Sequence, residues 1–186
     1  ELPGYFARIE TLRYLNLSNN RFDVFPQVLC DASGLMDLDV SFNAITQLPS
    51  SINKLVNLQR FIFVGNQVEE LPETMSSLTN LRTVDLRRNL VQDVSVLFPM
   101  PNVNVVQCEH NSIRHFEATL GARMRTLEVG QNPLTKVSLG AYLASDLTTL
   151  NLSYANMAKL EESLCKLLPA LTELILDRNS FVTLPE

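Results

Sequence analysis

Cys108, Glu109 and His110 are adjacent, and side chains of these types can bind a metal ion or serve as nucleophile and base. The second of the two histidines, His115, follows shortly after. Consecutive side chains of an extended segment alternate between its faces, so this triplet cannot converge on one ion. The sequence also has no phosphate-binding loop and no dinucleotide fingerprint. We therefore expect no catalytic residue, no metal site and no cofactor in this segment.

The cysteines point to structural thiols. Cys30, Cys108 and Cys165 are too far apart for a zinc site or a disulfide framework. Reduced thiols favour an intracellular protein. Two glycosylation triplets, at Asn16 and Asn151, point the other way, but both lie inside the repeat pattern described below, where such triplets arise by chance.

The charged residues are better suited to recognition than to catalysis. Arg87 and Arg88 are adjacent and follow Asp85 closely, in a chain whose formal net charge is -5. That acidity argues against a nucleic-acid partner. No apolar run reaches the ~20 residues that span a bilayer, and no signal segment opens the chain. We expect a cytoplasmic protein, with any attachment to the plasma membrane being peripheral, through the parent chain or its partner.

A repeated pattern positions these residues. Apolar residues occupy the first, fourth, sixth and eleventh positions in eight successive copies, and asparagine occupies the ninth position in seven of them. The copies start at Leu12, Leu35, Leu58, Leu81, Val103, Met124, Leu147 and Leu171. This is the leucine-rich repeat pattern. It predicts an α/β solenoid over residues 1–186, a horseshoe with a parallel sheet on its concave face and irregular or short helical segments on its convex face. Because the chain begins and ends inside a repeat, we expect a solenoid truncated at both ends.

The ninth-position asparagines should form a ladder, because each amide can satisfy backbone groups of adjacent turns. The ladder comprises Asn20, Asn43, Asn66, Asn89, Asn111, Asn132 and Asn179. Ala155 interrupts it, and we expect an irregular turn there, with Asn156 as a candidate substitute. In the same register Cys108 points into the core, and Cys30 and Cys165 lie half-buried on the convex side.

The positions left outside the core give a candidate protein-binding surface. It combines an apolar patch with neighbouring charged and polar side chains, a composition typical of binding hot spots. The candidates are Phe42, Arg60, Ile62, Val64, Arg82, Asp85, Arg87, Arg88 and His110. The alternative is a solvated sheet face with internal ion pairs such as Arg60–Asp85 or Arg87–Glu109.

A narrower resemblance rests on the change from regular repeats to irregular ones. It is carried by NLVQDVSVLFPMPNVNVVQCEHNSIRHF (89–116), MRTLEVGQNPLTKVS (124–138) and the tract from residue 146 to the chain end. This succession resembles the repeat region of fungal adenylate cyclases. The resemblance implies a regulatory module that faces a Ras-type small GTPase, with cAMP made from ATP and a divalent metal in a domain elsewhere in the parent chain. The resemblance carries over no site residue from that family to this sequence.

Other readings of the repeats stay open. Repeat regions of leucine-rich-repeat protein phosphatases and of Ras-scaffold proteins are similar in type. The concave face could also sense a small ligand such as a glycopeptide, or the repeats could serve only as a spacer.

Overall fold

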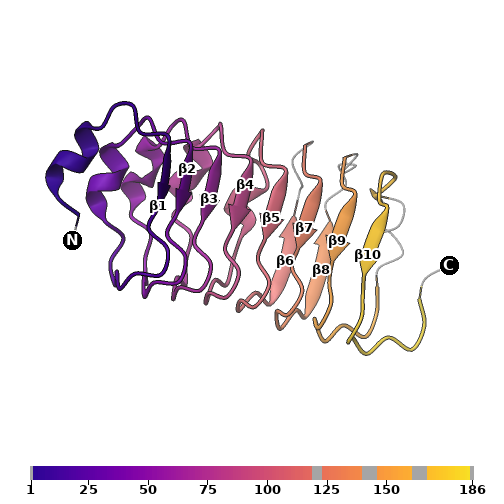
Figure 1. Cartoon of the computed structure of the whole chain (residues 1–186). Helices are drawn as coiled ribbons and strands as arrows, with labels where there is room; N and C mark the ends of the chain where they lie inside the picture. The colour runs from indigo at the N-terminus through magenta and orange to yellow at the C-terminus, as the bar shows by residue number, and fades with distance from the viewer. Residues whose placement is uncertain (1, 119–122, 140–145, 161–166, 185–186) are drawn as a thin grey trace.

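The computed structural model describes residues 2–118, 123–139, 146–160 and 167–184. Within these residues, short parallel strands lie side by side in one sheet along the whole solenoid (Figure 1). In sheet order they are β1 (Tyr14–Asn16), β2 (Asp37–Asp39), β3 (Arg60–Ile62), β4 (Thr83–Asp85), β5 (Val105–Gln107), β7 (Thr126–Glu128), β9 (Thr149–Asn151) and β10 (Glu173–Ile175). Each covers the third to fifth positions of a repeat. The predicted solenoid fold is confirmed.

The strands pair position for position. Phe61 of β3 lies opposite Leu38 of β2 and Val84 of β4, and all three are fully buried fourth-position residues. Residues at one repeat position therefore stack in a column across the sheet. The inward columns build the core by removing apolar surface from water, and the outward columns make the concave face.

Short 3-10 helices form the convex side of the first repeats, at the indigo and magenta end of Figure 1. They are η1 (Gly4–Arg8), η2 (Gln27–Asp31), η3 (Ser50–Lys54), η4 (Glu73–Ser77) and η5 (Ser95–Leu97). A proline precedes each of the first four; at Pro26, for example, φ is -65°. The proline ring fixes this φ, and its missing N–H costs nothing at a helix start. The recurring proline thus sets where the first four convex helices begin, whereas η5 follows Val94.

A second, two-stranded parallel sheet replaces the helices in the middle of the chain. β6 (His115–Ala118) pairs with β8 (Lys136–Leu139) on the return side of the solenoid. Phe116 of β6 is 1% exposed and meets Phe98 edge to face, with ring centroids 5.1 Å apart. The sequence predicts irregular or helical returns here, and the paired strands are a departure from that prediction. Repeat length does not account for it, because β6 lies in a repeat of 21 residues and β8 in one of 23, whereas the repeat of 22 residues contains η5.

The cysteines of the described residues belong to the core. Cys30 and Cys108 are 1% and 0% exposed, so Cys30 is more deeply buried than expected. Desolvation raises the pKa of the Cys30 thiol and raises that of Cys108 well above its usual value. Neither thiol is therefore poised to react. Cys165 lies outside the described residues.

The asparagine at the ninth position bridges neighbouring turns. Asn89 Nδ2 donates to the carbonyl oxygens of Phe63 (2.9 Å) and Leu86 (3.0 Å), and its Oδ1 accepts from the Val68 N–H (3.1 Å). Equivalent bonds are made by Asn43, Asn66, Asn111 and Asn132. Asn20 is exposed and donates only to carbonyls of its own repeat.

Ala155 leaves a gap in the ladder. Asn179 Oδ1 accepts from the Met157 N–H (3.0 Å) and its Nδ2 donates to the Leu152 carbonyl oxygen (2.8 Å), the bonds that each ladder amide makes to the preceding repeat, and its Oδ1 also accepts from the Ala155 N–H (3.1 Å). Asn156 is exposed with a φ of 55°, so it does not replace the missing ladder residue. The Leu134 N–H, which an amide at position 155 would bind, donates to the Asn132 carbonyl oxygen instead (2.8 Å).

A second asparagine ladder on the other side of the strands was not anticipated. Asn57, Asn80 and Asn102 each donate to a carbonyl of the preceding repeat, at 2.9, 2.8 and 2.8 Å. Each stands directly before the first apolar position of its repeat, and this recurrence is the signal that could have revealed it.

Candidate functional site: the concave face and its rim

The eighth residue of every repeat has a left-handed backbone, with φ between 51° and 65°. These residues form the eighth-position rim, where the chain turns away from the concave sheet: Asn19, Phe42, Gly65, Arg88, His110, Gln131, Tyr154 and Arg178. A left-handed residue ends the strand and starts the turn. The turn geometry thus aligns the rim side chains in a row along the sheet edge.

The apolar candidates do not all reach solvent. Phe42 is 50% exposed, Val64 is half-buried and Ile62 is only 7% exposed. Ile62 lies in register between Asp39 of β2 and Asp85 of β4. Packing between closely spaced strands therefore covers Ile62, contrary to the expected open patch, and Phe42 is the main apolar group that a partner can reach.

Gly65 explains how Phe42 is seated. A Cβ at Gly65 would lie 2.8 Å from Phe42 Cδ1, too close for two carbon atoms. Gly65 also has a φ of 65°, which glycine adopts without strain. The absence of a side chain at this rim position lets the Phe42 ring rest on the neighbouring turn.

The arginines divide into two kinds. Arg60 pairs with Asp37 at 3.2 Å. Arg87 binds Asp85 through Nε–Oδ1 (2.9 Å) and Nη2–Oδ2 (2.7 Å), which raises the pKa of its guanidinium. These pairs differ from the anticipated Arg60–Asp85 and Arg87–Glu109, because the aspartates on the adjacent strand and two residues back are better placed.

Of the expected charged groups, Asp85 is buried in the sheet face. Asp85 is 6% exposed and already bonded, so it supports Arg87 and is not open to a partner. Arg82 and Arg88 are exposed, and neither forms an ion pair within the part of the chain that the structure describes. They lie at opposite ends of β4 and are the arginines available for docking.

A carboxyl pair occupies the concave face over β5 and β7. Gln107 Nε2 donates to Glu128 Oε2 at 3.0 Å. Beside it, Glu109 Oε2 is buried with no hydrogen-bond partner among the described residues. Desolvation, with the neighbouring Glu128 carboxyl adding to it, raises the pKa of Glu109 to about 7. This part of the face is acidic, and the Glu109 carboxyl holds a proton near neutral pH. His110 lies next to it and is exposed.

Sequence reasoning missed an aromatic–arginine pair farther along the rim. The Arg178 guanidinium carbon lies 5.7 Å from the centroid of the Tyr154 ring, a cation–π contact. Tyr154 is nevertheless 48% exposed. Both residues are eighth-position residues, so their shared register was the available signal.

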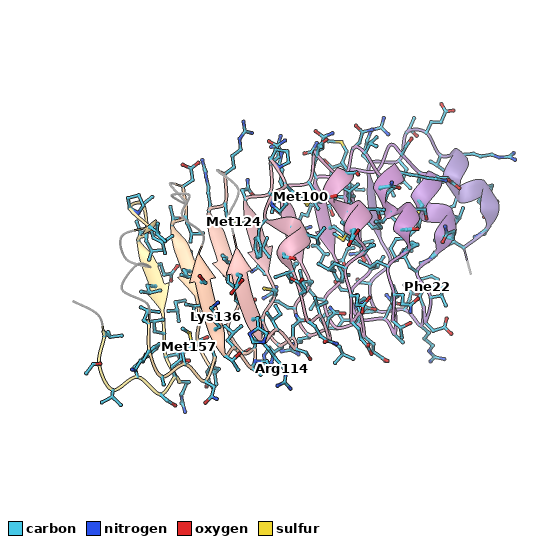
Figure 2. All side chains as sticks on the ribbon, turned by 180° about the vertical axis from the view of Figure 1, so that it is seen from behind. Phe22, Met100, Arg114, Met124, Lys136 and Met157 are labelled. Atoms are coloured by element: carbon cyan, nitrogen blue, oxygen red, sulfur yellow. The ribbon has the colours of Figure 1, made fainter. Side chains whose placement is uncertain are left out.

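The return side offers an open, mixed-charge hollow near the second sheet, on the face seen in Figure 2, where Arg114 and Lys136 are labelled. Lys136 pairs with Glu117, which lowers the pKa of that carboxyl, and Thr135 Oγ1 lies 3.2 Å from His115 Nδ1. Neighbouring charges are thus paired across β6 and β8. The described residues contain no group of three His, Cys, Asp or Glu side chains arranged to hold a metal ion. No helix among them is long and apolar enough to span a membrane.

Comparison with known proteins agrees with this picture. The sequence profile described as Leucine Rich Repeat matches residues 11–32. An adenylate cyclase of Mycosarcoma maydis is 55% identical over 99 residues, 53% of this chain and 4% of that protein. One of Podospora anserina is 34% identical over 185 residues, 99% of this chain and 8% of that protein. The chain spans less than a tenth of either relative.

Among solved structures, the leucine-rich repeat domain of APL1B superposes with a TM-score of 0.83 at 20% identity, over 99% of this chain and 53% of that chain. The likeness shows the fold alone. The strand columns and the asparagine ladder agree with this fold, and the cyclase relatives add the similarity in sequence. The chain has the leucine-rich repeat fold, and its sequence is similar to part of the fungal adenylate cyclases.

Proposed function

We propose that this chain is a regulatory protein-binding module of an adenylate cyclase and that it binds a Ras-type small GTPase. cAMP would be made from ATP in a catalytic domain outside this segment. The similarity to fungal adenylate cyclases supports the parent activity. The fold supports protein binding, since solenoids present extended concave surfaces for partners.

The observation that carries the proposal is the pair of unpaired arginines beside an exposed aromatic ring. Arg82 and Arg88 flank β4, and Phe42 is half-exposed on the rim two strands away. An exposed aromatic group beside free guanidinium groups has the composition of a binding hot spot. Effector-binding surfaces of small GTPases are typically acidic, so the exposed arginines would supply complementary charge and speed association.

Regulation requires that the two nucleotide states of the GTPase bind with different affinity, because a ligand shifts an equilibrium only through such a difference. The direct test measures the affinity of the 186-residue chain for the GTPase loaded with GDP or with a non-hydrolysable GTP analogue. We expect at least about tenfold tighter binding of the GTP form, corresponding to about 1.4 kcal/mol. Equal affinities, or no binding by a properly folded chain, would refute the proposal.

The docking surface is tested by charge reversal at Arg82 and Arg88. The double variant Arg82→Glu/Arg88→Glu should bind the GTP form about tenfold or more weakly, mainly through a slower association rate. Arg87 stays unchanged, because its reversal would set a carboxylate against Asp85. The matched control is Arg8→Glu/Arg21→Glu, which makes the same charge change at exposed arginines away from the concave face. Equal weakening by both variants would rule out a local docking surface.

A further inference from the structure

The eighth-position rim differs in charge from the face beside it. The rim holds two arginines, a histidine and two aromatic residues, and no acidic residue. The third, fifth and seventh positions, just inside it, carry the acidic groups: Asp37, Asp39, Asp85, Glu109, Glu128, Glu173 and Asp177. The same positions also hold Arg60 and Arg87, which pair with Asp37 and Asp85. The remaining carboxylates give the concave surface an acidic floor, and its edge is basic and aromatic.

Folding does not explain the rim side chains. A left-handed backbone disfavours residues with a Cβ by roughly 1–2 kcal/mol, and glycine avoids this strain. Only Gly65 uses that solution, and it does so where Phe42 needs the space. Phe42, Arg88 and Tyr154 hold large, exposed side chains at such strained positions. These side chains contribute little to the core, so we expect their role to be in binding at the surface.

We propose that an extended, acidic polypeptide segment binds along the eighth-position rim, with its carboxylates on Arg88 and Arg178 and its apolar side chains against Phe42 and Tyr154. This goes beyond the proposed function, because it assigns contacts along the whole solenoid and does not require the partner to be a GTPase.

The spacing of the rim defines the segment. Phe42 and Arg178 are separated by six strand steps in the sheet order of Figure 1, or about 29 Å at ~4.8 Å per step. An extended chain covers this distance in about nine residues. Arg88 and Arg178 are four steps apart, about 19 Å, which corresponds to carboxylates about six residues apart.

The acidic floor selects a polypeptide over a nucleic acid. A phosphate backbone carries a charge at every nucleotide and would face Asp39, Glu128 and Asp177 along its length. A peptide can place a carboxylate only where an arginine stands and neutral groups elsewhere. Charge complementarity therefore favours an acidic peptide with spaced carboxylates.

The test uses fluorescence anisotropy with the 186-residue chain and three labelled probes of about ten residues. One is an extended peptide with two glutamates six residues apart and apolar residues between them, the second replaces both glutamates by lysine, and the third is an oligothymidylate. We expect the glutamate peptide to bind best, with affinity falling as salt is added. Stronger binding of the lysine peptide or the oligothymidylate, or no binding of the glutamate peptide, would overturn the inference.

Variants locate the contact. Arg88→Glu/Arg178→Glu should weaken the glutamate peptide about tenfold or more, because two favourable charge contacts become repulsive. Arg8→Glu/Arg21→Glu serves as the charge-matched control and should leave binding within about twofold. Thermal melting establishes that each variant is folded. Equal loss in both would mean diffuse electrostatics and refute the rim. GTPase binding without peptide binding would refute this inference alone, and the reverse would refute the proposed function alone.

Discussion

The two halves of the solenoid share one sheet and differ in the described parts of their returns. From β1 to β3 the repeats are 23 residues long, and a 3-10 helix follows a proline in each return. From β5 onward the spacing changes, and β6 and β8 form a second sheet in place of the helices. The position-for-position pairing of the concave strands nevertheless continues unchanged from β1 to β10.

This contrast shows which parts of a repeat are constrained. The strand and the left-handed eighth residue recur in every repeat, whereas the return differs between the halves. One repeat lacks the ladder amide, at Ala155, and its strand β9 still pairs in register with β7 and β10. The concave surface can therefore be continuous although the return segments behind it differ.

The largest expected effect tests whether the second sheet is a true part of the core. Phe116→Ala removes a 1% exposed ring that packs against Phe98, and we expect it to cost about 3–5 kcal/mol of unfolding free energy in urea titrations. His115→Ala, at the exposed residue next to it, should change stability by less than about 0.5 kcal/mol. If both variants change the free energy of unfolding by a similarly small amount, the second sheet does not contribute to the stability of the core.

The ladder should contribute strongly in the regular half. Asn89→Ala leaves the Val68 N–H without its partner in the core, and the Phe63 and Leu86 carbonyls each keep only one of two amide donors. We expect a loss of about 2 kcal/mol in the same titrations. Asn20→Ala, at the exposed start of the ladder, should cost less than about 1 kcal/mol. A cost at Asn89 no greater than at Asn20 would contradict the structural role of the ladder.

The carboxyl pair in the second half should make stability depend on pH. Because the pKa of Glu109 is raised to about 7, above its usual value, the native state holds a proton that the unfolded state releases. Stability from this group is therefore present at pH ~4.5 and is lost as the pH rises through ~7.

Glu109→Gln should remove this loss. We expect the variant to be more stable than the parent at pH 8 by about 1 kcal/mol, once solvent screening is allowed for, with a difference that shrinks toward pH 5. The comparison of parent and variant at each pH cancels the contributions of the histidines. A pH-independent difference would show that the carboxyl carries no raised pKa.

The smallest effect concerns the rim. Arg88→Gly removes the strain of a side chain on a left-handed backbone but raises the conformational entropy of the unfolded chain. We expect these two changes to offset each other, with a net change in the free energy of unfolding within about 0.5 kcal/mol. Arg88→Val places a β-branched residue at the same φ of 57° and should cost about 1–2 kcal/mol more. Equal melting temperatures for the two variants would argue against a strained left-handed rim.

Much of the concave architecture was predictable, because apolar spacing fixes which side of a strand each residue takes. The positions of β3 and β4 follow directly from Leu58 and Leu81. The second sheet did not follow, because returns carry no repeated polar signal that distinguishes a strand at His115 from a turn. The Arg60–Asp37 pair could have been predicted, since both are third-position residues that lie directly opposite each other, whereas Asp85 lies opposite Ile62.

Protection from hydrogen exchange measures the central claim most directly. Exchange of the chain is compared with and without the GTP-loaded GTPase, and peptides covering residues 37–42, 60–65 and 83–88 report on the concave face and its rim. We predict slower exchange in these peptides and no change in η2 and η3 on the convex side. Protection confined to the convex helices, with the concave peptides unchanged, would contradict the account.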